Sequence, residues 1–327
     1  MFRTELTPAP LSEKINLKHP ILTIGSCFSE TIGNQLVDHK FNTCINPFGT
    51  IYNPISIHQL IEMALHNRLP DESGYAQRED VHVHYQFHSR FAALNRPALE
   101  DSIKKAISET HHFLQSAKWL MITYGTSWVY RLKSGNTVVA NCHKMPGQLF
   151  EKELLSPDTI LASFNALYSK IKSGNRGLQI LLTVSPVRHV RDTLELNSVS
   201  KSILRMVCHS ISTAYTDVYY FPAYELLLDD LRDYRFYASD LIHPSEEASR
   251  YIWQKFIEAC VDESTREFIT VWSALRQALL HKPFVPGSRS HRQFVESTIK
   301  KLEKLKNVVS IEHEVETLLN QLHEPKS

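Results

Sequence analysis

Two short segments near opposite ends of the sequence carry the residue types of a thiol-based catalytic site. The first is Gly25-Ser26-Cys27-Phe28-Ser29, which follows the apolar run Pro20-Ile21-Leu22-Thr23-Ile24. A β-branched strand that ends in a small-residue turn and opens a helix lifts one side chain out of a sheet, and the helix N-terminus stabilises negative charge beside it. A thiol reacts as its thiolate, so this position favours Cys27 as a nucleophile.

The second segment is Asp240-Leu241-Ile242-His243, which precedes Pro244-Ser245-Glu246. Proline suits the first turn of a helix, so His243 is expected to project from just before a helix. Asp240 is then close enough to reach one nitrogen of the imidazole ring. A carboxylate there fixes the tautomer and stabilises the imidazolium, as in a catalytic triad. The sequence therefore predicts His243 as the base and Asp240 as the residue that orients it.

Each of these assignments has an alternative. Ser26 is a rival nucleophile directly beside Cys27, and a cysteine after an apolar strand can also be a small buried core residue. Asp240 can cap a loop beside a surface histidine. The catalytic interpretation requires the Cys27 sulfur and the His243 imidazole, far apart in sequence, to meet in the fold.

The elements that would position these residues are typical of an α/β protein. Continuous apolar runs at Ile21–Ile24, Trp119–Tyr124, Leu178–Val184 and Val218–Phe221 are typical of a parallel sheet that is covered on both faces. Segments 98–117, 156–173 and 198–214 have the apolar spacing of amphipathic helices. This alternation predicts a doubly wound, mainly parallel sheet whose active site lies beyond the carboxyl ends of its strands. Cys27, Gly125, Ser185 and the 240–243 loop are all expected at that edge.

Two regions depart from this alternation. Polar residues alternate with mostly apolar ones over 80–91, which predicts a half-exposed antiparallel strand in a β-hairpin insertion, paired with 137–140. The insertion is placed at about 75–145 within a first domain, 1–264. From 265 to 327 the pattern predicts a C-terminal helical extension, which either packs on its own domain or forms a homo-oligomer.

Composition restricts the class of protein. The chain has 327 residues and a net charge of +1, which gives no overall electrostatic basis for binding nucleic acid or a membrane surface. We find no apolar signal segment and no run near the roughly 20 residues that a membrane span needs. The five cysteines are scattered without a CxxC pair, which argues against a disulfide framework or a common zinc spacing. A cytoplasmic protein with reduced thiols is expected.

Five segments in order resemble the bacterial GSCFA-domain family, which is related to the SGNH (GDSL-like) hydrolases. The similarity extends from about residue 2 to about residue 260. Its segments are Gly25-Ser26-Cys27-Phe28-Ser29, Asn46-Pro47-Phe48-Gly49-Thr50, Asn141-Cys142-His143-Lys144, Ser185-Pro186-Val187-Arg188-His189 and the stretch from Arg232 to Pro244. The resemblance implies an SGNH-type, flavodoxin-like three-layer fold.

The SGNH pattern implies roles for individual residues. Cys27 stands where that pattern has its serine nucleophile, and Asp240 and His243 match its Asp-x-x-His block. Gly49 corresponds to the glycine whose N–H group helps to form the oxyanion hole. In place of the third block's Gly-x-Asn, this sequence has Gly125-Thr126-Ser127, so a hydroxyl of Ser127 or Thr126 takes the place of the usual amide. The backbone N–H group of Cys27 completes the implied oxyanion hole.

Several further polar residues are candidates for lining a substrate cleft: His88, Asn141, His143, Arg188 and His189. Arg188 suits a carboxylate or phosphate on the substrate. Alternate histidines at 82, 84 and 88 also allow a zinc-site interpretation, but no acidic or cysteine partner has a recognisable local spacing. We therefore expect no metal and no cofactor.

The sequence analysis leads to three hypotheses. The favoured one is an acyl-transfer enzyme, either an esterase-like hydrolase or an acyltransferase, that acts on a small-molecule or glycan acyl substrate through Cys27. The first alternative is a non-catalytic module that binds a small molecule or glycan on an SGNH scaffold. The second is a metal-dependent hydrolase built on the histidines.

Overall fold

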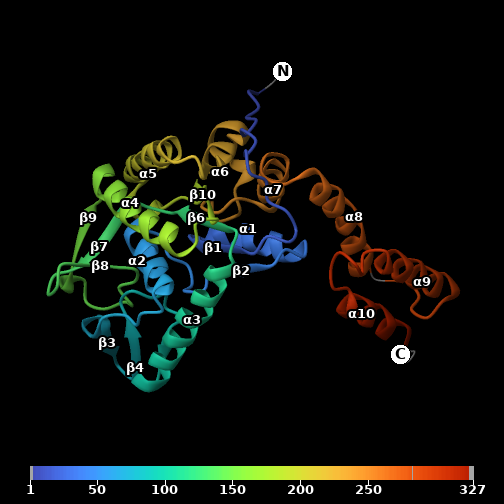
Figure 1. Cartoon of the computed structure of the whole chain (residues 1–327), viewed down its shortest axis with the longest axis horizontal. Coiled ribbons are helices and arrows are strands. Elements are labelled where there is room, and N and C mark those ends of the chain that lie inside the picture. The colour runs from blue at the N-terminus through green and yellow to red at the C-terminus, as the bar shows by residue number, and fades with distance from the viewer. Residues whose placement is uncertain (1–2, 282, 324–327) are drawn as a thin grey trace. The chain divides into compact units, whose positions relative to one another are not determined.

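A five-stranded parallel sheet forms the centre of the protein, as a computed structural model that describes residues 3–281 and 283–323 shows (Figure 1). In the sheet the strands lie in the order β2-β1-β6-β10-β11. Thr123 of β6 pairs with Gly25 of β1 and with Thr183 of β10, so neighbouring strands end at nearly the same level. The strands are β1 (Ile21–Gly25), β2 (Thr43–Ile45), β6 (Trp119–Tyr124), β10 (Gln179–Val184) and β11 (Val218–Tyr220).

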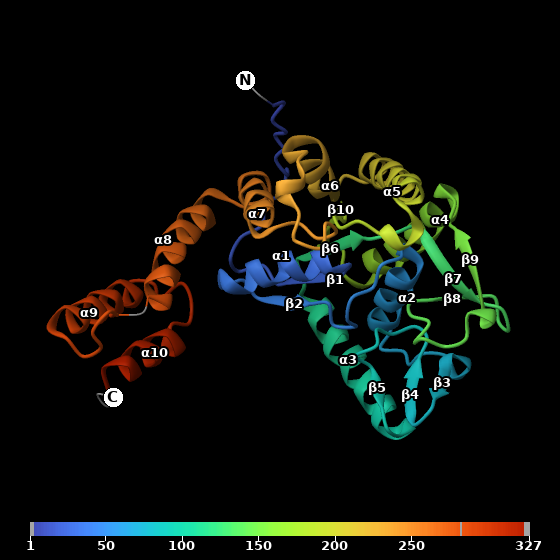
Figure 2. The ribbon, with the colours of Figure 1, turned by 180° about the vertical axis from the view of Figure 1, so that it is seen from behind.

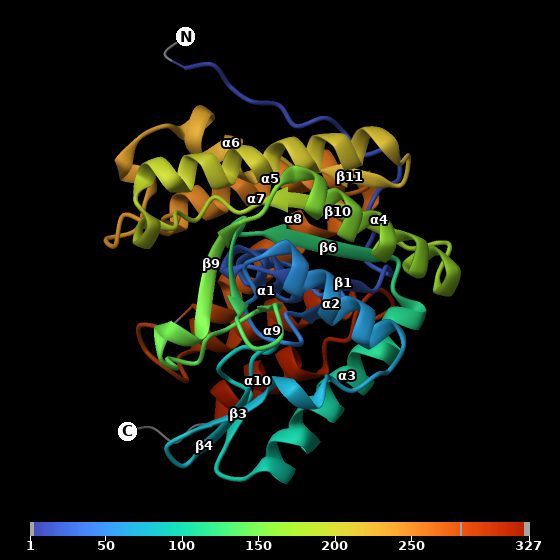
Figure 3. The same cartoon turned by 90° about the vertical axis from the view of Figure 1, so that its left-hand side faces the viewer.

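Helices cover both faces of this sheet because successive strand side chains point to opposite sides. Even-numbered residues such as Leu22, Ile122 and Leu182 join the main hydrophobic core. Helices α2, α4 and α5 lie side by side on that face (Figure 3). Odd-numbered residues such as Thr23 and Met121 face α1 and α7, which contact each other (Figure 2). The helices of these two layers are α1 (Cys27–Asp38), α2 (Pro54–Leu65), α3 (Arg96–Ser116), α4 (Pro157–Gly174), α5 (Leu194–Ala214), α6 (Ala223–Glu225) and α7 (Glu246–Cys260).

The strand order confirms the predicted doubly wound α/β fold. If the five strands are numbered in chain order, they lie in the flavodoxin-like order 2-1-3-4-5. The second strand is added on one side of the first, and the third and later strands are added on the other side, so the strand order reverses between the first and third strands. Ligands of such sheets bind beyond the carboxyl ends of the strands at that reversal. Here the reversal lies between β1 and β6, which are followed by Cys27 and Gly125.

Two small antiparallel sheets are inserted into this fold, and the predicted pairing of 80–91 with 137–140 is wrong. The first sheet contains β3 (Tyr75–Arg78), β4 (Val81–His84) and β5 (Ala92–Ala93), and the second contains β7 (Trp128–Leu132), β8 (Thr137–Val139) and β9 (Phe150–Leu154). In the first sheet β4 pairs with its sequence neighbours β3 and β5, and in the second β7 pairs with both β8 and β9. The two sheets still touch, since the N–H groups of Ala140 and Asn141 donate to the Tyr85 carbonyl.

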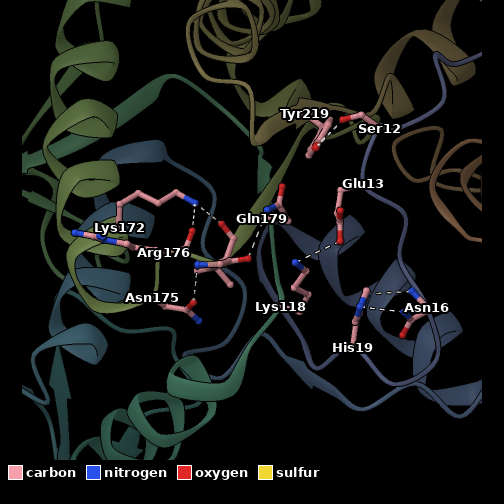
Figure 4. Close-up of polar contacts among 12 residues, drawn as sticks. Ser12, Glu13, Asn16, His19, Lys118, Lys172, Asn175, Arg176, Gln179 and Tyr219 are labelled. Atoms are coloured by element: carbon pink, nitrogen blue, oxygen red, sulfur yellow. Dashed lines mark hydrogen bonds and ion pairs between the residues drawn. The ribbon is translucent and has the colours of Figure 1, made fainter.

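The amino edge of the central sheet is fastened by polar contacts (Figure 4). Lys118 forms an ion pair with Glu13 at 3.3 Å, and the Asn175 amide donates to the carbonyls of Leu114 and Ala117. Lys172 donates to the Leu178 carbonyl just before β10. The contacts of Asn175 and Lys172 satisfy backbone carbonyls at strand and helix ends, which stabilises this edge of the sheet.

The chain divides into two compact units, Met1–Cys260 and Val261–Ser327. The second unit contains the helices α8 (Glu263–Leu280), α9 (Arg289–Glu303) and α10 (Glu312–His323), with Trp272, Val295 and Leu318 buried among them. Across the described ranges of both units, no helix combines the length and apolar character that crossing a membrane requires.

Candidate functional site

Cys27 begins α1 immediately after the turn that ends β1. Gly25 has φ of 141°, and a Cβ at this position would lie 2.2 Å from the Thr123 carbonyl oxygen, so the turn requires glycine. The Ser26 N–H group donates to the same carbonyl at 3.1 Å. The close approach of β1 to β6 thus determines where Cys27 leaves the sheet.

Opposing effects act on the Cys27 thiol. Burial raises its pKa above the ordinary value, and the backbone N–H groups of Cys27 and Phe28 oppose that shift. The positive charge of Lys201 also lowers the pKa, whereas Glu30 raises it. Cys27 remains partly exposed, but Ser26 is fully buried. Of the two adjacent nucleophile candidates, Cys27 is the accessible one.

Loops from three neighbouring strands meet beside Cys27. The Tyr52 carbonyl, after β2, accepts hydrogen bonds from the N–H groups of Gly125 and Thr126, which follow β6. Burial and the nearby charge of Cys27 raise the pKa of Tyr52. The His189 ring, after β10, packs edge-on against Tyr52 with ring centroids 5.3 Å apart. His189 therefore lies at the predicted edge.

Lys201 is a functional candidate that sequence reasoning missed. It is 1% exposed, and its Nζ donates to the carbonyls of Gly125 at 2.8 Å and Ser185 at 2.7 Å. Burial lowers its pKa to about 7, while the Cys27 charge acts in the opposite direction. A signal was present in the sequence, because Lys201 falls in the buried stripe Asn197, Lys201, Leu204, Cys208 and Ile211 of α5. A lysine in such a stripe must find polar partners at the end of its side chain.

Asp240 and His243 form the predicted pair. Oδ2 of Asp240 lies 2.7 Å from Nδ1 of His243, and Oδ1 accepts the backbone N–H groups of Ile242 and His243. These hydrogen bonds, that of the His243 ring first, lower the pKa of Asp240 to about 2. A carboxylate at Nδ1 places the ring proton there, which leaves the lone pair of Nε2 as an acceptor.

The loop that carries this pair is attached to the segment after β10. The Arg188 N–H group donates to the Ile242 carbonyl at 3.2 Å, and the next residue, His189, packs on Tyr52. The loop therefore lies at the same edge of the sheet as Cys27. Within the described part of the chain, no hydrogen bond joins the Cys27 sulfur to the His243 ring.

The groups predicted for the oxyanion hole have other partners in this structure. The Gly49 N–H group donates to the Asn46 carbonyl at 2.8 Å, and the hydroxyls of Thr126 and Ser127 bond to Ser200. Asn46 offers a different donor. Its Oδ1 accepts the N–H group of Gly25, whereas its buried Nδ2 has no hydrogen-bond partner among the described residues.

Comparison with known families identifies the chain. A model of the GSCFA family matches residues 20–256, well over half of the sequence. The chain belongs to the GSCFA family. A second model, of the C-terminal domain of GSCFA domain proteins, matches residues 272–324. The search of curated proteins gives no match.

The remaining predicted substrate residues of this GSCFA protein lie in three places. His88 lines a polar cleft together with Glu30, Asn46, Gly49 and Arg90. Nε2 of His143 lies 2.9 Å from the His84 carbonyl, and Oδ1 of Asn141 accepts the His143 N–H group, so both residues hold a turn against β4. The Arg188 guanidinium stacks 3.9 Å from the centroid of the Tyr237 ring.

The histidines of the alternative metal interpretation have other surroundings in this GSCFA protein. His84 is buried, and its Nε2 lies 3.1 Å from the Asp71 carbonyl. Over residues 3–281 and 283–323, no group of three or more His, Cys, Asp or Glu side chains converges as metal ligands would. Among the described residues, we find no set on which to base a metal site.

Proposed function

We propose that this GSCFA protein is an acyl-transfer enzyme in which Cys27 is the nucleophile, His243 the base and Asp240 its orienting carboxylate. The observation that carries the proposal is the position of Cys27. Its side chain lies at the start of α1, where backbone N–H groups lower the pKa of the thiol, at the strand reversal where ligands of such sheets bind. The Asp240–His243 pair at the same edge supplies a base with a fixed tautomer.

The proposed reaction has two stages. The Cys27 sulfur attacks the carbonyl carbon of an ester or thioester while its proton passes to Nε2 of His243. The C–O or C–S bond of the donor then breaks, and the leaving group takes that proton from His243. In the second stage, water or an acceptor hydroxyl or amine attacks the enzyme thioester. His243 accepts the proton of the attacking group and returns it to the Cys27 sulfur.

The exposed loop of His243 must bring the ring closer to the sulfur during this reaction. The His243 side chain is 48% exposed, so packing leaves it room to move. Catalytic hydrogen bonds are often long before substrate binds and tighten in the complex. We propose that substrate binding at the strand reversal closes this gap.

The N–H group of Cys27 and Nδ2 of Asn46 are the donors that we propose for the oxyanion. Asn46 is held beside the Gly25 turn by its own Oδ1, which leaves its unpartnered amide hydrogens for a ligand. The loss of one oxyanion donor commonly costs about 10²–10³ in turnover. This arrangement supports the proposal that GSCFA proteins are related to the SGNH hydrolases, with Asn46 supplying the amide that Gly125-Thr126-Ser127 lacks.

A binding module on the same scaffold is the second candidate function. The specific observation in its favour is that Thr126 and Ser127 use their hydroxyls to hold Ser200 of α5. A module of this kind would bind a small molecule or glycan at the strand reversal without turnover.

Because a working thiolate needs a reducing environment, we propose the cytoplasm as the site of the enzymatic activity.

Turnover of a panel of esters and acyl thioesters tests the enzymatic proposal. We expect the wild-type protein to release product. The turnover rates of Cys27→Ala and His243→Ala should be lower by a factor of at least about 10³. Cys142→Ala and His66→Ala are controls, because these residues are a second partly exposed cysteine and a histidine at the end of α2. Binding without turnover would favour the module. Equal inactivity of wild type and Cys27→Ala across the panel would reject the enzyme.

A further inference from the structure

A cavity of about 140 Å³ opens at the carboxyl edge of the sheet, beside the loop that carries His243. Its walls come from the segment after β10, from the π-helical turn Leu226–Leu231 and from residues 232–237. We propose that this cavity binds a phosphate monoester, which the acyl donor carries at the far end of its leaving group. The place of the phosphate on a donor rests on the proposed function, whereas the binding of the anion itself does not.

Arg188 forms one wall of this cavity. Its guanidinium lies over the Tyr237 ring, 3.9 Å from the centroid, and 5.2 Å from the centroid of Tyr234. Nη1 donates a long hydrogen bond of 3.5 Å to the Leu241 carbonyl. Because the ring contact uses the face of the guanidinium, N–H groups at its edge stay available for an oxyanion. Among the described residues, no carboxylate forms an ion pair with Arg188.

A second arginine lines the cavity at the end of the π-helical turn. Arg232 has φ of 47°, a conformation that favours glycine, and its N–H group donates to the Leu227 carbonyl at 3.1 Å. Within the described ranges its side chain has neither a hydrogen bond nor an ion pair that would offset the cost of this backbone. Left-handed non-glycine residues and π-helical turns are common at functional sites. Arg232 thus adds a second positive charge that no carboxylate balances.

Asp233, which also lines the cavity, has a partner of its own. Nη2 of Arg235 lies 2.9 Å from Oδ2 of Asp233, and the Arg235 N–H group donates to Oδ1. The unbalanced charge of the lining is therefore that of two guanidinium groups. A phosphate monoester carries about 1.5 to 2 negative charges at pH 7, so it matches this pair better than a carboxylate does. Leu227 and Leu228 add apolar surface, which suits a carbon chain next to the phosphate.

The strand order sets the distance between this cavity and the reacting sulfur. In the sheet, β6 and β10 separate β1 from β11. Neighbouring strands lie about 4.8 Å apart, so the ends of β10 and β11 are on the order of 10 and 15 Å from the end of β1, where Cys27 begins α1. A group bound in the cavity is therefore too far away to be the acyl group. It corresponds to the distal end of a long leaving group.

The same wall of the cavity holds the loop of the proposed base. Tyr237 pairs with Pro244 in an antiparallel bridge, and the Ala238 N–H group donates to the His243 carbonyl at 2.8 Å. The Arg188 N–H group donates to the Ile242 carbonyl from the other side. A donor anchored in the cavity would therefore lie against the loop that must approach Cys27.

Titration with inorganic phosphate and with acetate, followed by the backbone amide NMR signals of residues 227–243, tests the cavity. We expect saturable shifts in wild type, tighter for phosphate than for acetate, and a Kd for phosphate about tenfold or more higher in Arg188→Gln. Arg191→Gln is the control, because it removes the same charge from an exposed arginine of the same segment. Tighter binding of acetate, no saturable shift in wild type, or an unchanged Kd in Arg188→Gln would overturn the proposal.

Arg232→Gly covers the case in which loss of Arg188 unfolds the loop. Glycine relieves the left-handed backbone, so the urea midpoint of this variant should not fall below that of wild type. The Kd for phosphate should nevertheless rise by about threefold or more. A destabilised Arg232→Gly with wild-type phosphate affinity would show that the arginine serves the fold alone, and it would contradict the two-arginine site.

Two acyl thioesters that differ by one phosphate connect the cavity to the proposed function. Acyl pantetheine 4′-phosphate carries a phosphate at the far end of its thiol arm, and acyl pantetheine ends there in a hydroxyl. We expect kcat/KM of wild type to be about tenfold or more higher for the phosphorylated donor, because remote binding energy lowers the barrier. That ratio should fall toward one in Arg188→Gln and stay unchanged in Arg191→Gln.

The outcomes separate this inference from the proposed function. If both donors react through Cys27 with equal kcat/KM, the proposed function stands and the phosphate does not belong to the donor. If neither donor reacts but phosphate binding depends on Arg188, the anion site stands and the enzymatic proposal fails.

Discussion

At the scale of single residues, Asp240 holds His243 through a carboxylate that accepts three N–H groups. Two come from the backbone of the loop and one from the imidazole. Because the pKa of Asp240 is lowered to about 2, the carboxylate is ionised at neutral and mildly acidic pH. It therefore stays an acceptor for the imidazole N–H group in this range.

Asp240→Asn tests this role. The amide keeps the shape of the carboxylate but offers an N–H group or a weaker acceptor to the ring, which favours the wrong tautomer. We expect the rate of acyl transfer to fall by about 10²–10⁴ while substrate binding changes little. Asp233→Asn is the matched control, because Asp233 also accepts a backbone N–H group two residues ahead in an exposed loop. Equal rates for Asp240→Asn and wild type would exclude Asp240 from the mechanism.

Lys201 makes a second prediction at this scale, for stability against pH. Its pKa is about 7 in the folded protein and ~10.4 in an unfolded chain. Between these values the unfolded chain binds more protons, so this group makes the free energy of unfolding rise with pH, by on the order of 3 kcal/mol. The Cys27 thiol, whose pKa burial raises, acts in the opposite direction at the upper end of this window.

Urea unfolding between pH 7 and pH 10 measures this contribution as a difference between variants. We expect Lys201→Met to lose the rise that wild type shows. Lys255→Met should keep it, because the hydrogen bond to Glu5 raises the pKa of Lys255 and no proton is lost there within the window. A slope in Lys201→Met that matches wild type would show that Lys201 is protonated throughout.

At the scale of elements, the turn between β1 and α1 depends on one glycine. Gly25→Ala would place a methyl group 2.2 Å from the Thr123 carbonyl oxygen at a φ of 141°. We expect this change to destabilise the protein by about 3 kcal/mol or more, and to reduce the Cys27 alkylation rate because the start of α1 must shift.

Gly174→Ala is the control for this prediction. Gly174 ends α4, and a Cβ there would meet no atom within 4 Å. Its free energy of unfolding should change by no more than about 1 kcal/mol. Denaturant unfolding measures the free energy of unfolding of both variants. A Gly25→Ala value equal to that of wild type would mean that the end of β1 is less tightly packed than the contacts indicate.

The elements themselves were largely predictable from sequence. Long apolar runs predicted β1, β6, β10 and β11, because burial on both faces of a sheet leaves a clear pattern. Amphipathic spacing predicted the helices α3, α4 and α5. The strand β2 (Thr43–Ile45) was missed because it lies between Asn42 and Asn46 and has no continuous apolar run. The alternation of polar and apolar residues predicted the strand β4. Its partner strands depend on the geometry of the turns, which this alternation does not encode.

At the scale of the whole molecule, the site depends on strand order. The sequence predicted that Cys27, Asp240 and His243 lie at one edge of the sheet. It did not predict the order of the strands within the sheet. The 2-1-3-4-5 order brings the ends of β1 and β6 together, and α5 reaches across β6 and β10 to add Lys201. The apolar stripe of α5 indicates that Lys201 is buried, but only the strand order shows which carbonyls its amine contacts.

The division into two units makes a prediction about truncation. Residues 1–260 contain the whole parallel sheet and both of its helix layers. We therefore expect a chain of residues 1–262 to unfold cooperatively and to keep the wild-type rate of Cys27 alkylation. The homo-oligomer expected from the C-terminal helices is tested by light scattering on the same two proteins. Loss of folding in the shorter chain would contradict the division.

Acylation of one side chain is the most direct test of the account. The intact protein is exposed to acyl thioesters and activated esters, quenched, and analysed by mass spectrometry with peptide mapping. We predict a single acyl adduct on Cys27 that disappears in Cys27→Ala and forms much more slowly in His243→Ala. An adduct on Ser26 or on another residue, with Cys27 unmodified, would contradict the thiol mechanism.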